Sequence, residues 1–510
     1  MESREVEKLA HGTGITLVGS VAGNGLNYLA GIVISRLAGA SVVGAYFLSI
    51  VWIQLGSIVA RLGLADALLR FVPPARLSGD SQGAARVVKT ALLLAGTAAM
   101  ALSCLSALLL PAIGRLWSVS PEVVGYMSWF IWTIPLHVLF VLLVMAIQAQ
   151  QRMSAVVLAR DLVQPILLVG LTAVLISMEA PLLGLVAGYG LSLAAAIVFA
   201  AVLFRSARDW PVKVAGWMPL PPLLKFSLPI MAADVMHYLY RWFDTIVVSY
   251  FLDLEQVAVY NAAMRTSLVI SLVALAANAI YATMASGYYH TGERDKLQKS
   301  FQLSTRWSLI LALPMMLLLV VGADWILLLW GKEFAEGETT LALLGIAQLV
   351  GVPMVIMGYT LLMCNRQYVE VLDTVVLLPV VMLLNLLLIP RLGTVGGAIC
   401  VCISNMIGVS VRLLQVRGFL GIRVLDGKLL KPILAGVVAF LAGEWVHGSL
   451  IRMAGSGGAG EIGGGILVAY IAALAGAILI VFALCMLVLG IEEEDKTVIG
   501  MLLKRRWLRA

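Results

Sequence analysis

The feature that most constrains this chain is a succession of long, nearly uncharged runs, which extends from about residue 13 to about residue 490. Charged residues make up only 12% of the 510 residues, whereas soluble proteins carry roughly 25%. One helix across the hydrocarbon core of a bilayer needs about 20 apolar residues. We therefore predict an all-α polytopic membrane protein. About fourteen transmembrane helices are expected, at residues 13–36, 41–69, 88–111, 123–148, 154–177, 182–204, 226–251, 255–287, 302–322, 339–364, 368–390, 394–415, 429–450 and 463–490.

The distribution of Lys and Arg predicts the orientation of these helices. Met1–Ala10 is polar and no small-residue cleavage site follows a short apolar core, so the first span itself is expected to direct insertion. With the N-terminus in the cytoplasm, most of the 35 Lys and Arg fall in cytoplasmic segments, as the positive-inside rule requires. An even number of spans returns the basic C-terminus to the same side. We predict a multi-pass protein of the cell inner (plasma) membrane with both termini cytoplasmic.

An internal repeat organises the predicted helices. A shift of 214 residues places Ser35 on Ser249, Tyr46 on Tyr260, Arg152 on Arg366 and Pro165 on Pro379. Six spans in each copy give both copies the same orientation, and transporters built from two such bundles commonly bind substrate between them. The predicted domains are a six-helix bundle (1–206), a cytoplasmic interfacial linker (207–224), a second six-helix bundle (225–416), and two additional helices with a basic tail (417–510).

Charged residues inside predicted spans indicate function, because they are expensive in lipid and usually face a cavity or one another. The seventh span has the densest set of ionisable residues, namely Asp234, His237, Arg241 and Asp244. Their spacing keeps them within about 80° of the helix circumference, and Tyr238 lies close to the same face. Two interpretations stay open: an ion-paired stripe that joins the two halves, and a stripe that lines a central cavity.

The first, second and eighth spans also have a polar face. The first two spans of each half of the chain therefore all carry polar residues along one side. If these helices surround one cavity, its cationic members are Arg61, Arg241 and Arg265. Guanidinium groups bind phosphate oxygens in a bidentate fork and keep their charge in a low dielectric. A substrate that carries pyrophosphate is therefore expected. The candidate substrate-binding residues are Arg61, Arg241, Arg265, Asn27, Gln54, Tyr238 and Asn261.

Enzyme signatures are missing from the sequence. There is no phosphate-binding glycine loop, nucleophile elbow or HExxH motif. The five cysteines lie in or beside apolar runs, and Cys400-x-Cys402 lacks metal-site spacing. We expect a membrane transporter with no catalytic residue, cofactor or metal. Arg160–Asp161 is interpreted as a cytoplasmic helix-end anchor, although a gate that closes and opens would use the same chemistry. His137 is interpreted as a hydrogen-bonded structural histidine.

Two stretches near the N-terminus resemble a known family. Residues 19–46 read GSVAGNGLNYLAGIVISRLAGASVVGAY, and residues 61–74 read RLGLADALLRFVPP. Gln148–Arg152 and Pro165 also fit the pattern. The chain resembles the polysaccharide-biosynthesis flippases, the Wzx-like branch of the multidrug/oligosaccharidyl-lipid/polysaccharide exporter superfamily. The resemblance covers the whole length in topology and is specific in sequence over about the first ninety residues.

The resemblance implies a pair of helix bundles that moves undecaprenyl-diphosphate-linked oligosaccharides from the cytoplasmic to the periplasmic leaflet. It also implies a cationic central cavity. Arg61, Arg241 and Arg265 are assigned to this cavity by their position in the spans, because no strict sequence motif identifies them. The implied partners are a lipid-linked oligosaccharide, membrane lipids, a coupling proton or sodium ion, and a polysaccharide polymerase, with no nucleic acid. The titratable candidates for ion coupling are Asp234, His237 and Asp244.

Four alternative functions fit the sequence less well. A drug or organic-cation antiporter of the same superfamily typically has twelve spans and an acidic cavity. Lipid II flippases share fourteen spans, but their arginine-rich start to the first helix is missing here. A membrane glycosyltransferase or ligase needs a sizeable external loop, and the longest one expected, Asp324–Thr339, is short. A structural scaffold would not need buried charge.

Overall fold

The chain folds into helices along its whole described length. The computed structural model describes residues 3–116, 121–178, 181–206, 211, 214–424, 427–454 and 464–490, and no strand occurs within these ranges. The elements are α1 (Ser3–Ala38), α2 (Ala40–Arg61), α3 (Leu64–Leu77), α4 (Ser81–Leu116), α5 (Pro121–Ile131), α6 (Ile134–Ala149), α7 (Met153–Val156), the π-helix η1 (Val157–Val163), α8 (Gln164–Ile176), α9 (Pro181–Arg205), α10 (Leu220–Phe251), α11 (Leu254–Ser267), α12 (Val269–His290), α13 (Arg294–Val321), α14 (Ala323–Leu328), the 3-10 helix η2 (Lys332–Gly337), α15 (Glu338–Met363), α16 (Gln367–Leu420), the 3-10 helix η3 (Gly427–Leu429), α17 (Leu430–Ala454) and α18 (Gly464–Val488).

Eleven helical stretches in the described ranges are long and apolar enough to cross a membrane. Helices suit this setting because each one satisfies its own backbone hydrogen bonds where no water is available. One stretch, Tyr368–Leu420, joins two predicted spans across a kink at Gly393, whose φ of 61° breaks the helical backbone. The prediction of an all-α polytopic membrane protein is confirmed, and the number fourteen stays a prediction. The glycine-rich segment 455–463 and the basic tail 491–510 lie outside the described residues.

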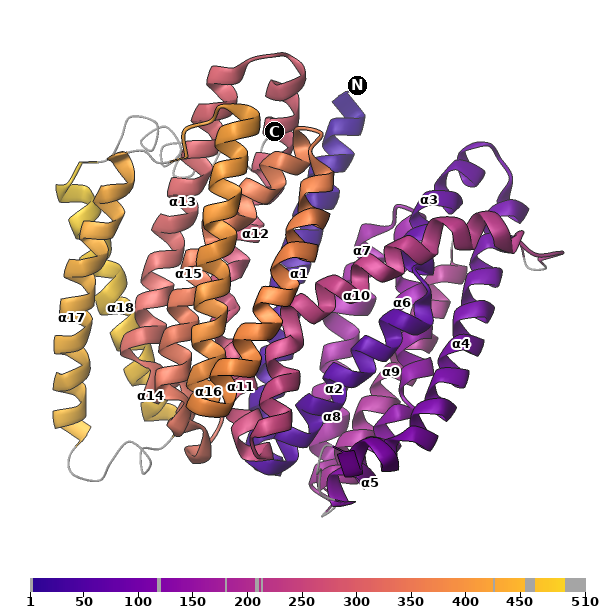
Figure 1. Cartoon of the computed structure of the whole chain (residues 1–510), viewed down its shortest axis with the longest axis horizontal. Helices are drawn as coiled ribbons and strands as arrows, with labels where there is room; N and C mark the ends of the chain where they lie inside the picture. Colours follow the sequence, from indigo (N-terminus) through magenta and orange to yellow (C-terminus); the bar gives the residue numbers. More distant parts are fainter. Residues whose placement is uncertain are drawn as a thin grey trace. The chain divides into compact units, whose positions relative to one another are not determined.

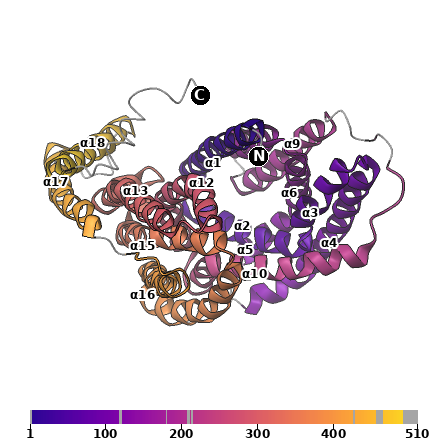
Figure 2. The same ribbon diagram turned by 90° about the horizontal axis from the view of Figure 1, so that it is seen from above.

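The described chain forms two compact units. Unit 1 contains residues 1–266, 330–340 and 368–404, and unit 2 contains residues 267–329, 341–367 and 405–510. Within each unit the long helices run alongside one another, side-on in Figure 1 and end-on in Figure 2. In unit 1, α8 packs on α9 and α1, and α6 packs on α3, α4 and α9. The division into domains 1–206, 207–224, 225–416 and 417–510 stays a prediction.

Local backbone geometry follows the same 214-residue offset that relates the two halves of the sequence. Helices α2 and α11 begin at residues 40 and 254, and helices α7 and α16 begin at residues 153 and 367. Gln151 and Asn365, which are also one offset apart, both adopt a left-handed backbone with φ of 59°. Left-handed conformations are uncommon for residues other than glycine. Their recurrence shows that both segments end one helix and start the next in the same way.

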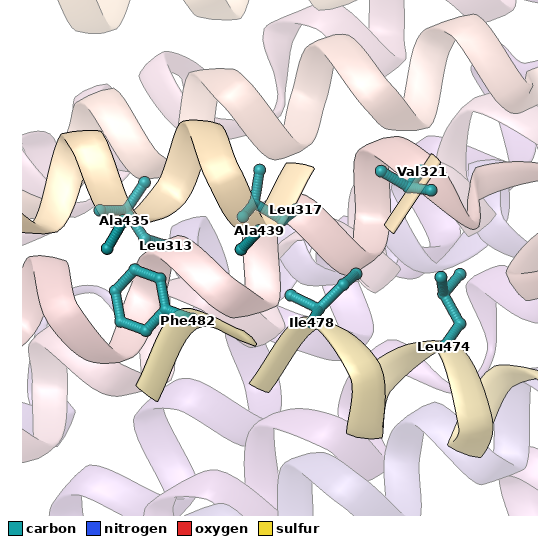
Figure 3. Close-up of a cluster of buried hydrophobic side chains, with 8 residues drawn as sticks. All are labelled: Leu313, Leu317, Val321, Ala435, Ala439, Leu474, Ile478 and Phe482. Carbon is teal, nitrogen blue, oxygen red and sulfur yellow. The ribbon is translucent and has the colours of Figure 1, made fainter. Parts of the chain in front are cut away.

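The C-terminal helices α17 and α18 pack on α13 within unit 2. Figure 3 shows their shared apolar cluster, in which Ala435 and Ala439 of α17 are fully buried. The other members are Leu313, Leu317, Val321, Leu474, Ile478 and Phe482. Small residues one turn apart allow helix backbones to approach closely in a membrane, where packing replaces the hydrophobic effect between helices. This cluster therefore depends on the small size of the two alanines.

We expect Ala439→Leu to destabilise this packing, because three added carbon atoms must enter a full cluster. Overpacking typically costs about 1–3 kcal/mol. A lower unfolding temperature of the purified protein in detergent is the expected result. Val437→Leu adds bulk to a residue that is 54% exposed, and it is expected to leave the unfolding temperature unchanged. Equal unfolding temperatures for both variants would contradict the proposed packing.

Candidate functional site

A polar cavity of about 360 Å³ lies inside unit 1, among helices α1, α2, α6, η1, α8, α9 and α11. Apolar side chains of α6, such as Phe140 and Val144, form part of its wall. Its polar lining comes from all seven elements. The polar lining residues are Asn27, Tyr46, Gln54, His137, Arg160, Asp161, Gln164, Tyr189 and Arg265. The structure thus brings together three predicted site residues, Asn27, Gln54 and Arg265.

Arg265 is the cationic residue that α11 contributes to this cavity. Its guanidinium carbon lies 4.4 Å from the centroid of the Phe47 ring, which belongs to α2. A cation over an aromatic face is attracted by the ring quadrupole. Its Nε is buried and has no hydrogen-bond partner within the described part of the chain. A fixed guanidinium with an unused donor is suited to bind an anionic group that enters the cavity.

Tyr46 helps to build the aromatic side of the same cavity. Tyr46 is only 7% exposed. The centroid of its ring lies 6.0 Å from that of Phe130 and 6.5 Å from that of Tyr189. Such pairs prefer tilted and edge-to-face geometries at 4.5–7 Å. Tyr46 and Tyr189 both line the cavity. The rings therefore give the polar groups a rigid frame.

Arg160 and Asp161 form an ion pair on the cavity wall. Arg160 donates from Nε to Asp161 Oδ1 at 2.8 Å and from Nη2 to Oδ2 at 3.1 Å. The pair lies on η1, and π-helical turns are found frequently at functional sites. The sequence predicts a helix-end anchor for this pair, and the structure places both residues in the lining of the cavity. Asp161 supplies the carboxylate among the described lining residues.

The glycines of the N-terminal motif bring α1 against η1. A Cβ added to Gly19 would lie 2.2 Å from Val157 Cγ1, and one added to Gly23 would lie 2.7 Å from Asp161 Cβ. Real side chains cannot approach so closely, so this pairing requires glycine at both positions. Asn27 donates from Nδ2 to the Gly23 carbonyl at 2.9 Å. The motif that carried the family resemblance thus positions the acidic wall of the cavity.

Tyr238 lies behind Gln54 and connects α10 to α2. Its buried hydroxyl lies 2.9 Å from the Val51 carbonyl oxygen and 3.3 Å from Gln54 Oε1, and it donates to these acceptors. Gln54 itself lines the cavity. Tyr238 is therefore placed to orient Gln54, and its direct contact with a substrate stays a prediction.

The four ionisable residues of α10 have different environments. Asp244 is buried and accepts hydrogen bonds from the Tyr260 hydroxyl and, at 2.7 Å, from the Thr245 backbone N–H. Asp234 is half-buried, whereas His237 and Arg241 are exposed. His237 Nε2 lies 3.4 Å from Thr374 Oγ1. None of the four is among the described residues that line the cavity, and their role in ion coupling stays a prediction.

Arg61 and Asn261 also lie outside the lining of this cavity. Arg61 ends α2 and donates from Nε to the Ser57 carbonyl at 3.3 Å. Asn261 is fully buried and donates from Nδ2 to the Val257 carbonyl at 2.9 Å. Both side chains therefore form a hydrogen bond to the preceding turn of their own helix. Substrate contact by Arg61, Arg241 and Asn261 stays a prediction.

Sequence reasoning missed several residues of this cavity. His137 was interpreted as a hydrogen-bonded structural histidine, but it lines the cavity and its buried Nδ1 has no partner among the described residues. Gln164 and Tyr189 were not singled out. The available signal was the position of Arg160 and Asp161 within the predicted span 154–177, because charge inside a span usually faces a cavity.

The fold and the site together define a multi-pass membrane protein with a polar, arginine-containing cavity inside a helical unit. The chain belongs to the family described as polysaccharide biosynthesis protein, whose model matches residues 9–286. The model of the MatE family matches residues 229–390. The predicted family resemblance is therefore confirmed.

Three known proteins illustrate the similarity. The probable low-salt glycan biosynthesis flippase Agl15 of Haloferax volcanii is 23% identical over 202 residues, which cover 39% of this chain and 43% of that protein. The lipid II flippase MurJ in an inward closed conformation has a TM-score of 0.71 at 14% identity, over 92% of this chain and 97% of MurJ. An inward-facing MATE family multidrug transporter has a TM-score of 0.64 at 18% identity, and the match covers 78% of this chain and 94% of the transporter. These two structures share the fold.

Proposed function

We propose that this protein is a flippase for a lipid-linked oligosaccharide. The substrate is an undecaprenyl-diphosphate-linked glycan, which moves from the cytoplasmic to the periplasmic leaflet for surface polysaccharide synthesis. The observation that carries the proposal is Arg265, whose guanidinium lies in a polar cavity of a membrane protein and whose Nε has no partner among the described residues. A guanidinium fork matches phosphate oxygens in geometry and charge.

The comparisons support the same class of substrate. The relative from Haloferax volcanii is named a glycan biosynthesis flippase, and MurJ is named a lipid II flippase. Transport is proposed to proceed by alternating access, in which the substrate site opens to one side of the membrane at a time. This role makes the protein a transporter with no catalytic step of its own.

The proposal includes a coupling ion and a membrane location. A proton or a sodium ion would supply the driving force, with Asp234, His237 and Asp244 as the titratable candidates. The protein would lie in the inner membrane with both termini in the cytoplasm. It would pass its substrate to a polysaccharide polymerase. Imposed pH and sodium gradients across liposomes that contain the purified protein test the ion directly.

The decisive experiment is a flipping assay with the purified protein in liposomes. A fluorescent undecaprenyl-diphosphate oligosaccharide is incorporated, and a membrane-impermeant quencher reports how much of it occupies the outer leaflet. We expect movement between leaflets that depends on the protein. Liposomes with heat-denatured protein give the background rate. If several glycans move no faster than this background, the flippase proposal is wrong.

A second candidate is an antiporter for organic cations. The match of the MatE family model to residues 229–390 favours it. The cavity in unit 1 argues against it, because Arg160 and Arg265 outnumber the carboxylate of Asp161 there. Gradient-driven efflux of organic cations from the same liposomes, without movement of lipid-linked glycan, would favour the antiporter.

A further inference from the structure

The ion pair Arg160–Asp161 joins two neighbours in sequence, which is an unusual geometry. Side chains at successive helical positions do not normally face each other. Here both nitrogens of the Arg160 fork, Nε and Nη2, contact the two oxygens of Asp161 at 2.8 and 3.1 Å. A phosphate group offers two oxygens to a guanidinium in the same bidentate way. Asp161 thus occupies the position on Arg160 that a phosphate would take.

The two members of the pair are held to different degrees. The Asp161 side chain is 11% exposed, whereas that of Arg160 is 38% exposed. The backbone and Cβ of Asp161 are held by the close approach of α1, because a Cβ added to Gly23 would lie 2.7 Å from Asp161 Cβ and 2.9 Å from its Cα and carbonyl oxygen. Arg160 has a long, flexible stem that faces the cavity. Arg160 is therefore the member of the pair that is free to change partner.

The second arginine of the cavity has an unused donor of its own. Arg265 keeps a buried Nε without a partner among the described residues, and it lines the same cavity of about 360 Å³. The Arg160–Asp161 pair is electrically neutral, so the charged side chains among the described lining residues sum to one positive charge. A diphosphate carries more negative charge than one arginine neutralises. Release of Arg160 from Asp161 would supply the second cation.

We propose that Asp161 holds Arg160 in place of the ligand phosphate, and that a diphosphate entering the cavity takes Arg160 over from Asp161. The proposal rests on the proposed function and adds to it a specific exchange of partners. Asp161 acts as an internal competitor that lowers the affinity for the anion. Such competition suits transport, since a site must bind firmly enough to load and weakly enough to release. Arg160 contacts the ligand, and Asp161 is a positioning residue.

The test is binding of two diphosphates to the purified full-length protein in detergent, by isothermal titration calorimetry. The probes are inorganic pyrophosphate and farnesyl diphosphate. We expect Asp161→Asn to bind both roughly tenfold more tightly, because a competing charge is lost while the side-chain shape is kept. Arg160→Gln is expected to bind both roughly tenfold more weakly. Asp295→Asn, an exposed carboxylate of α13, is the control and is expected to match the wild type.

The double variant Arg160→Gln/Asp161→Asn separates exchange from a simple change in cavity charge. If Asp161 acts through Arg160, the gain from Asp161→Asn is largely lost in the Arg160→Gln background. An equal gain in both backgrounds would overturn the exchange. Arg160→Lys leaves Asp161 intact and keeps the charge, but it loses the fork. It is expected to bind several-fold more weakly, and wild-type affinity in that variant would also overturn the proposal.

The failure of this inference and the failure of the flippase proposal are distinguishable. Protein-dependent flipping by the wild type, with no tighter binding by Asp161→Asn, would overturn the exchange alone. The absence of both flipping and diphosphate binding in the wild type would overturn both. Equal affinities for pyrophosphate and farnesyl diphosphate would argue against a lipid-linked ligand while supporting the exchange, provided that the variants shift as expected.

Discussion

Arg265→Gln is expected to lower the rate of protein-dependent flipping by about tenfold to a hundredfold. Hydrogen bonds to charged groups contribute roughly 1.5–3 kcal/mol, and each 1.4 kcal/mol corresponds to about a tenfold change. Arg265 is placed to make such bonds, because its Nε has no partner in the described part of the chain and its guanidinium is stacked on Phe47 at 4.4 Å. Glutamine keeps a hydrogen-bonding group but removes the charge and the fork.

The flipping assay in liposomes measures this loss, normalised to the amount of folded protein. Arg265→Lys keeps the charge without the bidentate geometry, so its rate is expected to lie between those of the wild type and Arg265→Gln. Arg294→Gln changes an exposed arginine at the start of α13, and it serves as the matched control with an expected wild-type rate. A wild-type rate for Arg265→Gln would rule out a phosphate-binding role for Arg265.

Gly23→Ala is expected to reduce transport more than tenfold and to lower the unfolding temperature. The new Cβ would lie 2.7 Å from Asp161 Cβ and 2.9 Å from both its Cα and its carbonyl oxygen. Two of these three atoms belong to the backbone, so the contact is relieved only if α1 and η1 move apart. Overpacking of this kind costs about 1–3 kcal/mol. The movement would also displace the Arg160–Asp161 pair from the cavity wall.

Gly25→Ala provides a control on the same helix, because a Cβ at Gly25 meets nothing within 4 Å. Alanine is more favourable than glycine inside a helix by up to about 1 kcal/mol. The control is therefore expected to keep its transport activity and to melt at the same or a higher temperature. Thermal unfolding in detergent and the flipping assay give the two readouts. If the two glycine variants behave alike, the close packing of α1 on η1 is not what the cavity requires.

The candidate site was only partly predictable from the sequence. Arg265, Gln54 and Asn27 were identified because each lies on a polar face of an apolar span, and the structure brings them to one cavity. Asp244 is predicted to face a cavity or an ion partner, and the structure shows in addition that it accepts hydrogen bonds from Tyr260 and Thr245. Helical spacing alone does not tell which neighbour a polar stripe will contact.

The sequence by itself determined the all-α membrane fold, because long runs without charge can satisfy their backbone only as helices in lipid. It also determined the 214-residue offset, which recurs in the left-handed Gln151 and Asn365. Only the tertiary structure decided that Arg160 and Asp161 line the cavity with Arg265. These residues lie on η1 and α11, more than a hundred positions apart, and their meeting depends on packing such as that of Gly23 against Asp161. Contacts of this kind arise from the shapes of several helices at once, so no periodicity within one helix encodes them.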